Sequence, residues 1–400
     1  MSSARVSSAA RDPRVRPPDR RDRIVAAAAS AFSRHGFHGA RLTEIADDAG
    51  VSAPALYRHF AGKSDLLSAV TRQMAVSTAE ILDSVPPRPD DPAGELTALL
   101  EAFTAGVLTR RQTGDLYRWE WRALSPDDRA FIREIRLALH RRVRGLLLAT
   151  RPGLGKRDAD VLTDAVFAVA ASPSNHRVSL PRKQIEMLIR DAALTAGAAE
   201  LPEPATVPVP PPGLSPTARR ETVLTEAVRL FADHGFHEVT IEQIAAAADL
   251  PPSGVYRHFG SKQAILVAAL HRASERTTAA VATGLARTDS RDQALTGLAQ
   301  QYARLCAGDP AIITVYRRCV GALGDAERAD LRRQQRINVD EWATWLRDAR
   351  PELSSGAARF LVHAALDVIT DLTCSPHATD PDTAASIALA VLRNTPVSAG

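Results

Sequence analysis

Two eleven-residue stretches of this chain, one in each half, are closely similar. Residues 57–67 read YRHFAGKSDLL and residues 256–266 read YRHFGSKQAIL, 199 positions later in a chain of 400 residues. The same offset extends the match without a gap, and 16 of the 47 positions paired between 24–70 and 223–269 are identical. Two unrelated halves that happened to share a short motif would not stay aligned at one offset over this length, so the sequence predicts a duplicated domain.

A proline-rich segment separates the two copies. Residues 201–216 read LPEPATVPVPPPGLSP and include seven prolines, a composition typical of an extended spacer without a core of its own. We therefore expect two folded units, at about 20–200 and 215–398.

Both units are predicted to be all-α. Apolar residues recur with the 3.6-residue period of a helix near the start of each unit. These positions are Ile24, Ala27, Ala28, Ala31 and Phe32 in the first unit, and Val223, Ala227, Leu230 and Phe231 in the second. Thr240 and Gln243 have the spacing of a capping box, and Ser52 follows a glycine break as a helix N-cap. The alternation typical of strands is missing from the sequence.

Composition excludes several classes of protein. No run of about 18 apolar residues is present, so we expect no membrane span. Cys306, Cys319 and Cys374 are odd in number and form no CxxC, which favours reduced, mostly buried thiols in a cytoplasmic protein.

The charge is concentrated at the start of the chain. The net charge is +4, and the seven arginines and three aspartates of the first 23 residues account for all of it. The folded units are therefore near neutral. Affinity for a nucleic acid would have to come from a few well-placed cations and from the basic arm that holds Arg5, Arg11, Arg14 and Arg16. This arm either follows a minor groove or stays unbound.

Motifs of catalysis and of metal binding are not found. GKS at 62–64 lacks the upstream glycine of a phosphate loop, and no GxSxG, HExxH or dinucleotide fingerprint occurs. HGFH recurs at 35–38 and 234–237, but it straddles a turn, and no cysteine or carboxylate partner for a metal site is in view. We expect no enzyme activity, no cofactor and no metal.

The duplicated region reads as a helix-turn-helix, with a first helix at 42–49, a turn at 50–52 and a second helix at 53–59. The pattern F-x-x-x-G-F, I-A-x-x-A-G-V-S and L-Y-x-H-F-x-x-K-x-x-L-L resembles TetR-type transcriptional regulators, and it occurs twice. The second copy departs from it at Pro251, where serine is usual. The resemblance implies a DNA-binding domain followed by a helical effector and dimerisation domain in each half. The expected boundaries are 1–19 for a disordered basic arm, 20–68 for the first helix-turn-helix domain, 69–200 for the first helical effector domain, 201–216 for the linker, 217–267 for the second helix-turn-helix domain and 268–398 for the second helical effector domain.

The resemblance also assigns residues to DNA. They are Arg41, Thr43, Ser52, Ala53, Pro54, Ala55, Tyr57, Arg58, His59 and Lys63 in the first half, and Thr240, Pro252, Ser253, Gly254, Tyr256, Arg257, His258 and Lys262 in the second. The tyrosines, histidines and lysines are expected to meet phosphates. Small side chains at the start of each second helix favour readout of thymine methyls and DNA shape.

Three arginines need separate interpretations. Arg58 and Arg257 either reach DNA or remain solvated. Arg41 stands where the family has a threonine cap, and because a cation opposes the dipole at a helix start, we expect Arg41 to face DNA. Phe60 and Phe259 are interpreted as core residues.

The two halves differ where they would read bases, SAPAL against PPSGV. We therefore expect a monomer that acts as a covalent pseudo-dimer on an asymmetric double-stranded operator, with a higher oligomer on DNA left open. Trp119, Glu120 and Arg122 are candidates for binding a small apolar or lipid-like effector; the alternative is a set of core tryptophans and surface charges.

The stretches LYRWEWRALSPDDR, SNHRVSLP and YRHFGSKQAIL resemble the double-TetR repressors of lipid-import (mammalian cell entry) operons in mycobacteria. This implies a ligand-released repressor in an actinobacterial cytoplasm. A transcriptional activator stays open, as does a small-molecule-binding protein whose helix-turn-helix units mediate protein contacts.

Overall fold

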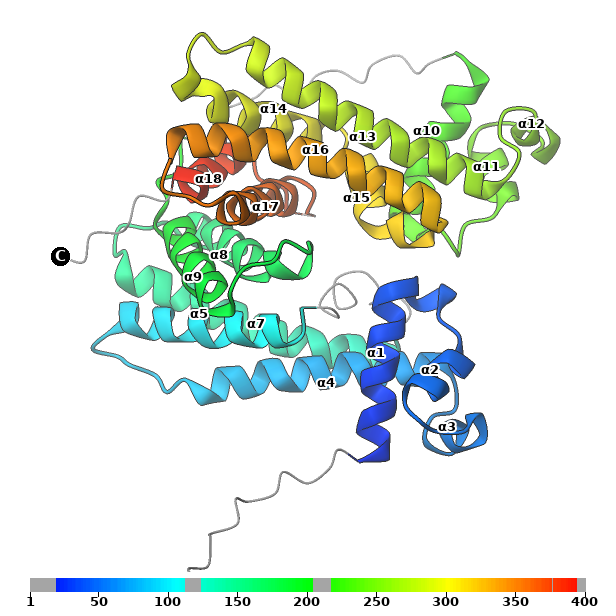
Figure 1. Cartoon of the computed structure of the whole chain (residues 1–400), viewed down its shortest axis with the longest axis horizontal. Helices are drawn as coiled ribbons and strands as arrows, with labels where there is room; N and C mark the ends of the chain where they lie inside the picture. The colour runs from blue at the N-terminus through cyan, green and yellow to red at the C-terminus, as the bar shows by residue number, and fades with distance from the viewer. Residues whose placement is uncertain (1–18, 112–123, 204–216, 376, 394–400) are drawn as a thin grey trace, which may run out of the picture.

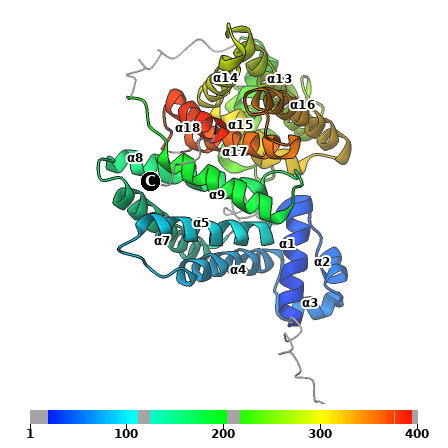
Figure 2. The ribbon, with the colours of Figure 1, turned by 60° about the vertical axis from the view of Figure 1, so that its left-hand side comes forward.

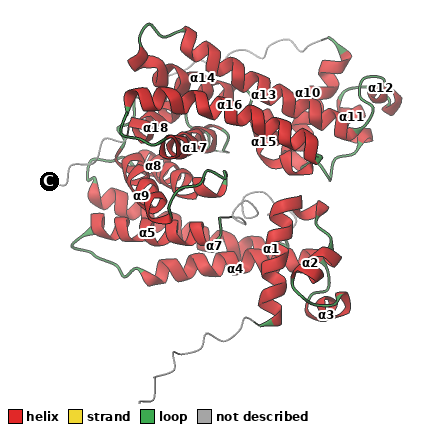
Figure 3. Cartoon of the chain, in the orientation of Figure 1, coloured by secondary structure: helices red, strands yellow, loops and turns green. Residues whose placement is uncertain are grey.

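The computed structural model describes residues 19–111, 124–203, 217–375 and 377–393. Every regular element in these ranges is a helix, which confirms the all-α prediction (Figure 3). The candidate effector residues Trp119, Glu120 and Arg122, the basic arm and most of the proline-rich segment lie outside the described residues. No helix in these ranges combines the length and apolarity that crossing a bilayer requires.

The α-helices described in the first half recur in the same order in the second, which also contains α15 and the 3-10 turns η3 and η4. The first half consists of α1 (Arg20–Gly39), α2 (Leu42–Asp48), α3 (Ala53–His59), α4 (Lys63–Ser84), α5 (Pro92–Thr109), α7 (Pro126–Thr150), α8 (Lys156–Ala171), the 3-10 turn η2 (Ser172–Ser174) and α9 (Arg182–Ala198). The second half consists of α10 (Arg219–His234), α11 (Ile241–Ala247), α12 (Pro252–Tyr256), α13 (Lys262–Ala286), η3 (Arg291–Gln293), α14 (Ala294–Gly308), α15 (Pro310–Cys319), η4 (Val320–Ala322), α16 (Asp325–Ala349), α17 (Ser355–Thr373) and α18 (Pro381–Arg393). Helices α4 and α13 begin 199 positions apart, which is the offset of the sequence repeat.

The two halves meet through a bundle of four helices. α8 and α9 of the first half pack on α17 and α18 of the second, and this junction lies at the centre of the molecule in both views (Figures 1 and 2). The small residues of α17, including Ala357, Ala358, Ala364 and Ala365, are almost fully buried and permit close helix approach. The halves are thus joined by side-chain packing as well as by the chain itself.

The apolar core is distributed unequally between the halves. One continuous core runs from the first effector domain at Val85 through the bundle to the second helix-turn-helix and its effector domain. The first helix-turn-helix has a separate core, from Ile24 to Ala75, which Leu124 and Ile132 extend toward α7. Since the two cores do not merge, the first helix-turn-helix is the more independent of the two.

Polar contacts at the junction come from the stretch SNHRVSLP at 174–181. The ring of His176 stacks on that of His363 with centroids 4.2 Å apart, and it meets Phe360 edge-on at 4.4 Å. Asn175 donates from Nδ2 to Oδ2 of Asp367 across the junction, at 2.7 Å. No feature of the sequence indicated that this stretch would join the halves.

Arg111 fixes the loop that carries these residues. Its guanidinium donates to the backbone carbonyls of Pro173, His176 and Val178 at 2.7–3.1 Å and to Nδ1 of His176 at 3.2 Å. Burial, with the nearby His363, Arg111 and Arg177, lowers the pKa of His176 well below its usual value. The junction histidine is therefore neutral at pH 7.

Candidate nucleic-acid interface

The first helix-turn-helix is held by three buried apolar side chains. Ile45 of α2, Leu56 of α3 and Phe60 after α3 are each 1% exposed or less. Ser52 caps α3 by accepting from the backbone N–H of Ala55, as the sequence predicted. The guanidinium of Arg21 lies over the Phe60 ring at 5.0 Å, which ties the end of α3 to α1.

Packing of Leu56 inward turns the opposite face of α3 to solvent. Tyr57 is 55% exposed, and Arg58 and His59 are also exposed. At the start of the helix, Ser52 and Pro54 are exposed, whereas Ala53 and Ala55 are half-buried. A phenol, a guanidinium and an imidazole at the end of one short helix are groups that can donate to phosphate oxygens.

Two further exposed residues, Arg41 and Thr43, lie at the start of α2, the first of the two helices of the helix-turn-helix. Arg41 precedes α2 in an extended conformation, and its side chain makes no capping hydrogen bond. Thr43 is exposed in the first turn. Both are placed so that they can reach a partner outside the chain, and their contact with DNA stays a prediction.

The second copy has the same plan with a shorter recognition helix. Val255 and Phe259 are buried, and Tyr256 is 54% exposed, almost the same as Tyr57. Helix α12 ends at Tyr256, so Arg257 and His258 lie in the turn that follows, where they are exposed. Pro252 occupies the first turn of α12, as predicted; Pro252 and Ser253 are exposed and Gly254 is half-buried.

The predicted capping box of the second copy is confirmed. Thr240 Oγ1 accepts from the N–H of Gln243 at 3.2 Å, and the Gln243 side chain accepts from the N–H of Thr240 at 2.8 Å. The Thr240 hydroxyl is therefore already engaged in capping α11. The equivalent position in the first copy is Arg41, so only the second copy caps this helix with a side chain.

The turn between the two helices requires a left-handed residue. Gly50 has φ +65° in the first copy, and its counterpart Asp249 has φ +53° in the second. Glycine adopts this conformation readily, whereas aspartate does so at a cost. The same bend is therefore built with strain in the second copy.

The structure gives Lys63 and Lys262 a role that the sequence did not predict. Lys63 Nζ donates to the carbonyls of His38 and Ala40 at 2.9 and 3.1 Å. Lys262 Nζ donates to the carbonyls of Phe236, His237 and Val239 at 2.7–3.3 Å. Each ammonium therefore fastens the turn after the first helix of its half, and a phosphate would have to share it with these carbonyls.

The two helix-turn-helix units touch each other through equivalent residues. The rings of His38 and His237 stack with centroids 4.2 Å apart, and Nε2 of His38 lies 3.8 Å from Oε1 of Glu238. Burial, followed by the charge of His38 and of the ammonium groups of Lys262 and Lys63, lowers the pKa of His237 to about 4. Both recognition helices, α3 and α12, lie at the same side of the molecule in Figure 1. The recurring HGFH motif was the only sequence signal of this contact.

A family model described as "Bacterial regulatory proteins, tetR family" matches residues 24–70 and 223–269, the two units just described. The chain carries the tetR-family domain twice. The matched segments cover most of α1 and α10, all of α2, α3, α11 and α12, and the beginnings of α4 and α13. The match does not extend to the helical domains that follow them.

Curated relatives of the tetR-family segments are transcriptional regulators. The HTH-type transcriptional activator FasR of Mycolicibacterium smegmatis is 36% identical over 85 residues, which are 21% of this chain and 39% of that protein. The HTH-type transcriptional repressor SCO4008 of Streptomyces coelicolor is 35% identical over 97 residues, 24% of this chain and 47% of that protein. The chain thus spans less than half the length of these relatives. Their names are those of transcriptional regulators and not of enzymes, in agreement with the expectation from the sequence that this chain is not an enzyme.

Among solved structures, the chain matches a TetR-family transcriptional regulator from Bordetella parapertussis 12822. It is 22% identical, covers 44% of this chain and 95% of its own, and superposes with a TM-score of 0.39. The match corresponds to about one half of this chain.

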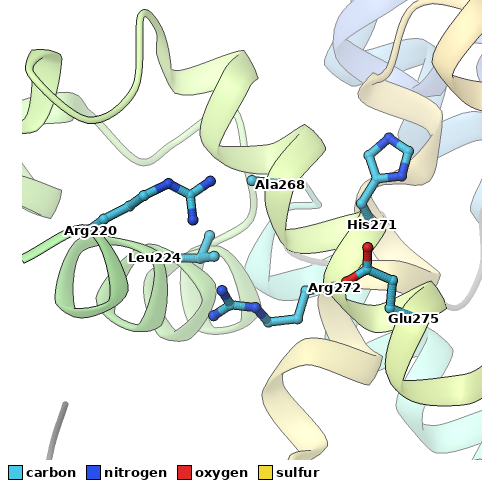
Figure 4. Close-up of a pocket in the computed structure, with 6 residues that line it drawn as sticks. All are labelled: Arg220, Leu224, Ala268, His271, Arg272 and Glu275. Atoms are coloured by element: carbon cyan, nitrogen blue, oxygen red, sulfur yellow. The ribbon is translucent and has the colours of Figure 1, made fainter. Parts of the chain in front are cut away.

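One small cavity lies beside the second tetR-family domain, between α10 and α13 (Figure 4). It is lined by Arg220, Leu224, Ala268, His271, Arg272 and Glu275. Arg272 is paired with Glu221 at 2.7 Å, and the Arg220 guanidinium lies over the Phe259 ring at 4.8 Å. These mostly charged walls do not suit the apolar effector predicted from the sequence. In the described ranges no group of three or more His, Cys, Asp or Glu side chains is arranged to hold a metal ion.

Proposed function

We propose that this chain is a ligand-released repressor that binds an asymmetric operator as a covalent pseudo-dimer in the cytoplasm. The observation that carries the proposal is the pairing of two unlike reading surfaces within one molecule. Each half exposes an arginine, a histidine and an equally exposed tyrosine at the end of its recognition helix or in the turn that follows it, while the small residues before them differ. Groups that meet phosphate are thus kept in both halves, and groups that meet bases are not.

The four-helix junction of α8, α9, α17 and α18 supports the pseudo-dimer. It buries apolar side chains from both halves in one core, and the Asn175–Asp367 hydrogen bond and the His176–His363 stack fix its polar part. Chains with a single tetR-family domain need a second copy to present two reading heads. Here the second head is supplied by the same polypeptide.

The effector is proposed to bind the first helical domain. Three buried polar atoms there have no partner among the described residues: Thr104 Oγ1 on α5, Ser172 Oγ on η2 and His176 Nε2 just after η2. α5 and η2 pack on each other, and an unmade hydrogen bond in such a place costs about 1–3 kcal/mol. A mainly apolar ligand with one or two hydroxyl or carbonyl groups would satisfy them.

In the corresponding part of the second half, the buried polar side chains already have partners within the chain. Arg317 makes buried ion pairs with Asp367 and Asp371 at 3.0 and 2.8 Å, and Tyr302 lies beside Thr370. We therefore propose that the second helical domain packs against the first half and does not bind an effector. An effector derived from lipids, and target genes of lipid transport, fit the sequence resemblance and are part of the proposal.

DNA fragments from the region upstream of the chain's own coding sequence provide the test. A footprint should show two adjacent, unlike half-sites, and operators rebuilt from two copies of either half-site should bind at least tenfold more weakly than the natural pair. Tyr57→Phe and Tyr256→Phe should each weaken binding with little change in its salt dependence, because each removes an uncharged donor to phosphate and no cation. Arg182→Ala on α9, an exposed residue far from either recognition helix in sequence, is the matched control.

Ligand release is tested on the same complex. Palmitate and cholesterol, added separately, should release DNA from the wild type, and Thr104→Val should abolish release without changing affinity for DNA. Equal binding of all three operators would refute the pseudo-dimer. Promoter activity that rises with the bound chain would show an activator instead of a repressor.

A further inference from the structure

Two of the three cysteines lie together in the second helical domain. Cys306 stands in the last turn of α14 and is fully buried, whereas Cys374 directly follows α17 and is half-buried. Cys374 Sγ lies 3.6 Å from the carbonyl oxygen of Cys306 and 3.8 Å from Thr373 Oγ1. Helices α14 and α17 pack directly on each other, and the two thiols are hydrogen-bonding neighbours at their interface.

The surroundings make the two thiols unequal. Burial raises the pKa of the Cys306 thiol well above its usual value. Hydrogen bonding with Cys306 lowers the pKa of the Cys374 thiol, and Thr373 and the positive charge of Arg317 act in the same direction. Thiolates are the nucleophiles in thiol oxidation, so the accessible member of the pair is the one prepared to react first.

We propose that Cys374 and Cys306 form a redox-responsive pair, which a hydroperoxide converts to a disulfide between α17 and α14. The Cys374 thiolate would attack one peroxide oxygen, the O–O bond would break, and the leaving hydroxide would take up a proton to become water. The resulting sulfenic acid at Cys374 would then be attacked by the Cys306 sulfur, which loses its proton, and the sulfenic oxygen would leave as a second water. Two thiols and one hydrogen peroxide thus give one disulfide and two waters.

The position of the pair connects it to the junction between the halves. Cys374 directly follows α17, whose last turns carry Asp367 and Asp371. Asp367 accepts from Arg317 of the second half and, across the junction, from Asn175 of the first half, and Asp371 also accepts from Arg317. A disulfide would fix this end of α17 to α14. Oxidation would therefore act on the helix that holds the two halves together.

Hydrogen peroxide added to the intact reduced chain provides the test, with Cys319 as the internal control because it is buried on α15. Intact mass and peptide mapping should show the loss of two hydrogens and a single Cys306–Cys374 link that dithiothreitol reverses. Cys319→Ser should form the link as the wild type does. Cys374→Ser should not form it, and Cys306→Ser should leave a sulfenic acid at Cys374 that dimedone traps.

A wild type that keeps all three thiols under peroxide, a link that includes Cys319, or over-oxidation of Cys374 without a disulfide would each overturn the proposal. Thermal unfolding before oxidation checks that each variant is folded, and alanine replaces serine where serine does not fold. The measurement needs no DNA, so its outcome is independent of the function proposed above.

Discussion

The imidazole rings of His38 and His237 stack on each other with their centroids 4.2 Å apart and their planes inclined by 23°. The two residues are equivalent by the sequence repeat, so the contact lies where the two helix-turn-helix units meet. Arg328 of α16 adds a second link by donating to the carbonyl oxygen of Arg34 in α1 at 3.4 Å. The distance between the two helix-turn-helix units is therefore restrained by contacts of the first unit with the second half as well as at the bundle.

Replacing His38 with alanine should loosen this restraint. We expect the His38→Ala chain to bind its operator about three- to tenfold more weakly and to tolerate one or two inserted base pairs between the half-sites better than the wild type. Gel shifts with a spacer series measure both effects. His35→Ala, in the same HGFH motif, should leave the spacing preference unchanged; the same preference in His38→Ala would contradict the idea.

Lys63→Met separates a structural role from a phosphate contact. Because Lys63 Nζ donates to the carbonyls of His38 and Ala40, its loss should lower the free energy of unfolding by about 1–3 kcal/mol without DNA present. Thermal and urea unfolding measure this change. Lys183→Met at the exposed start of α9 should have little effect. Undiminished stability of Lys63→Met, combined with weaker DNA binding, would favour the original phosphate assignment alone.

The strained turn of the second copy predicts a stabilising change. Asp249 has φ +53°, where its counterpart is Gly50, so Asp249→Gly should stabilise the chain by about 0.5–1 kcal/mol. The reverse exchange, Gly50→Asp, should destabilise it by a similar amount. Urea unfolding of the two variants checks the pair, and a destabilised Asp249→Gly would show that the aspartate side chain contributes more than its backbone costs.

The bundle should lose stability in mild acid. Burial, followed by the charge of Arg111, lowers the pKa of His363 to about 4, below its ordinary value of 6.5. The unfolded chain therefore binds more protons between these values, so stability is complete above about pH 6.5 and falls as the pH decreases toward 4. We expect a loss on the order of 1–3 kcal/mol from this group. Unfolding measured from pH 7.5 to 4.5 should show a shallower decline for His363→Gln than for the wild type.

Local features of the site could be predicted from the sequence. The Thr240–Gln243 capping box and the Ser52 cap join residues only three positions apart, so their spacing along the chain determines their contacts. The burial of Phe60 and Phe259 followed instead from their place in the repeated motif. The repeat itself set the order and type of the helices, which is why the all-α fold was predictable.

Contacts between distant positions could not be predicted in the same way. A lysine at a helix start looks the same in sequence whether its ammonium meets a phosphate or, like Lys63, two carbonyls 23 and 25 positions earlier. Asp367, which accepts from Asn175, is 192 positions away, and His363, which stacks on His176, is 187 positions away, so only the packing of the two halves brings these residues together. Arg111 likewise carried no signal, because its partners are backbone carbonyls.

Because α8 and α9 share a bundle with α17 and α18 of the same polypeptide, dilution cannot separate the two halves. Tethered partners typically experience an effective concentration on the order of millimolar. Occupancy of a target should therefore rise in proportion to the number of molecules in the cell, instead of with its square as for a dissociating pair. Under the proposed function, a mutation in one recognition helix changes the recognition of one half-site only. The DNA sequence that such a fused regulator binds can therefore change one half-site at a time.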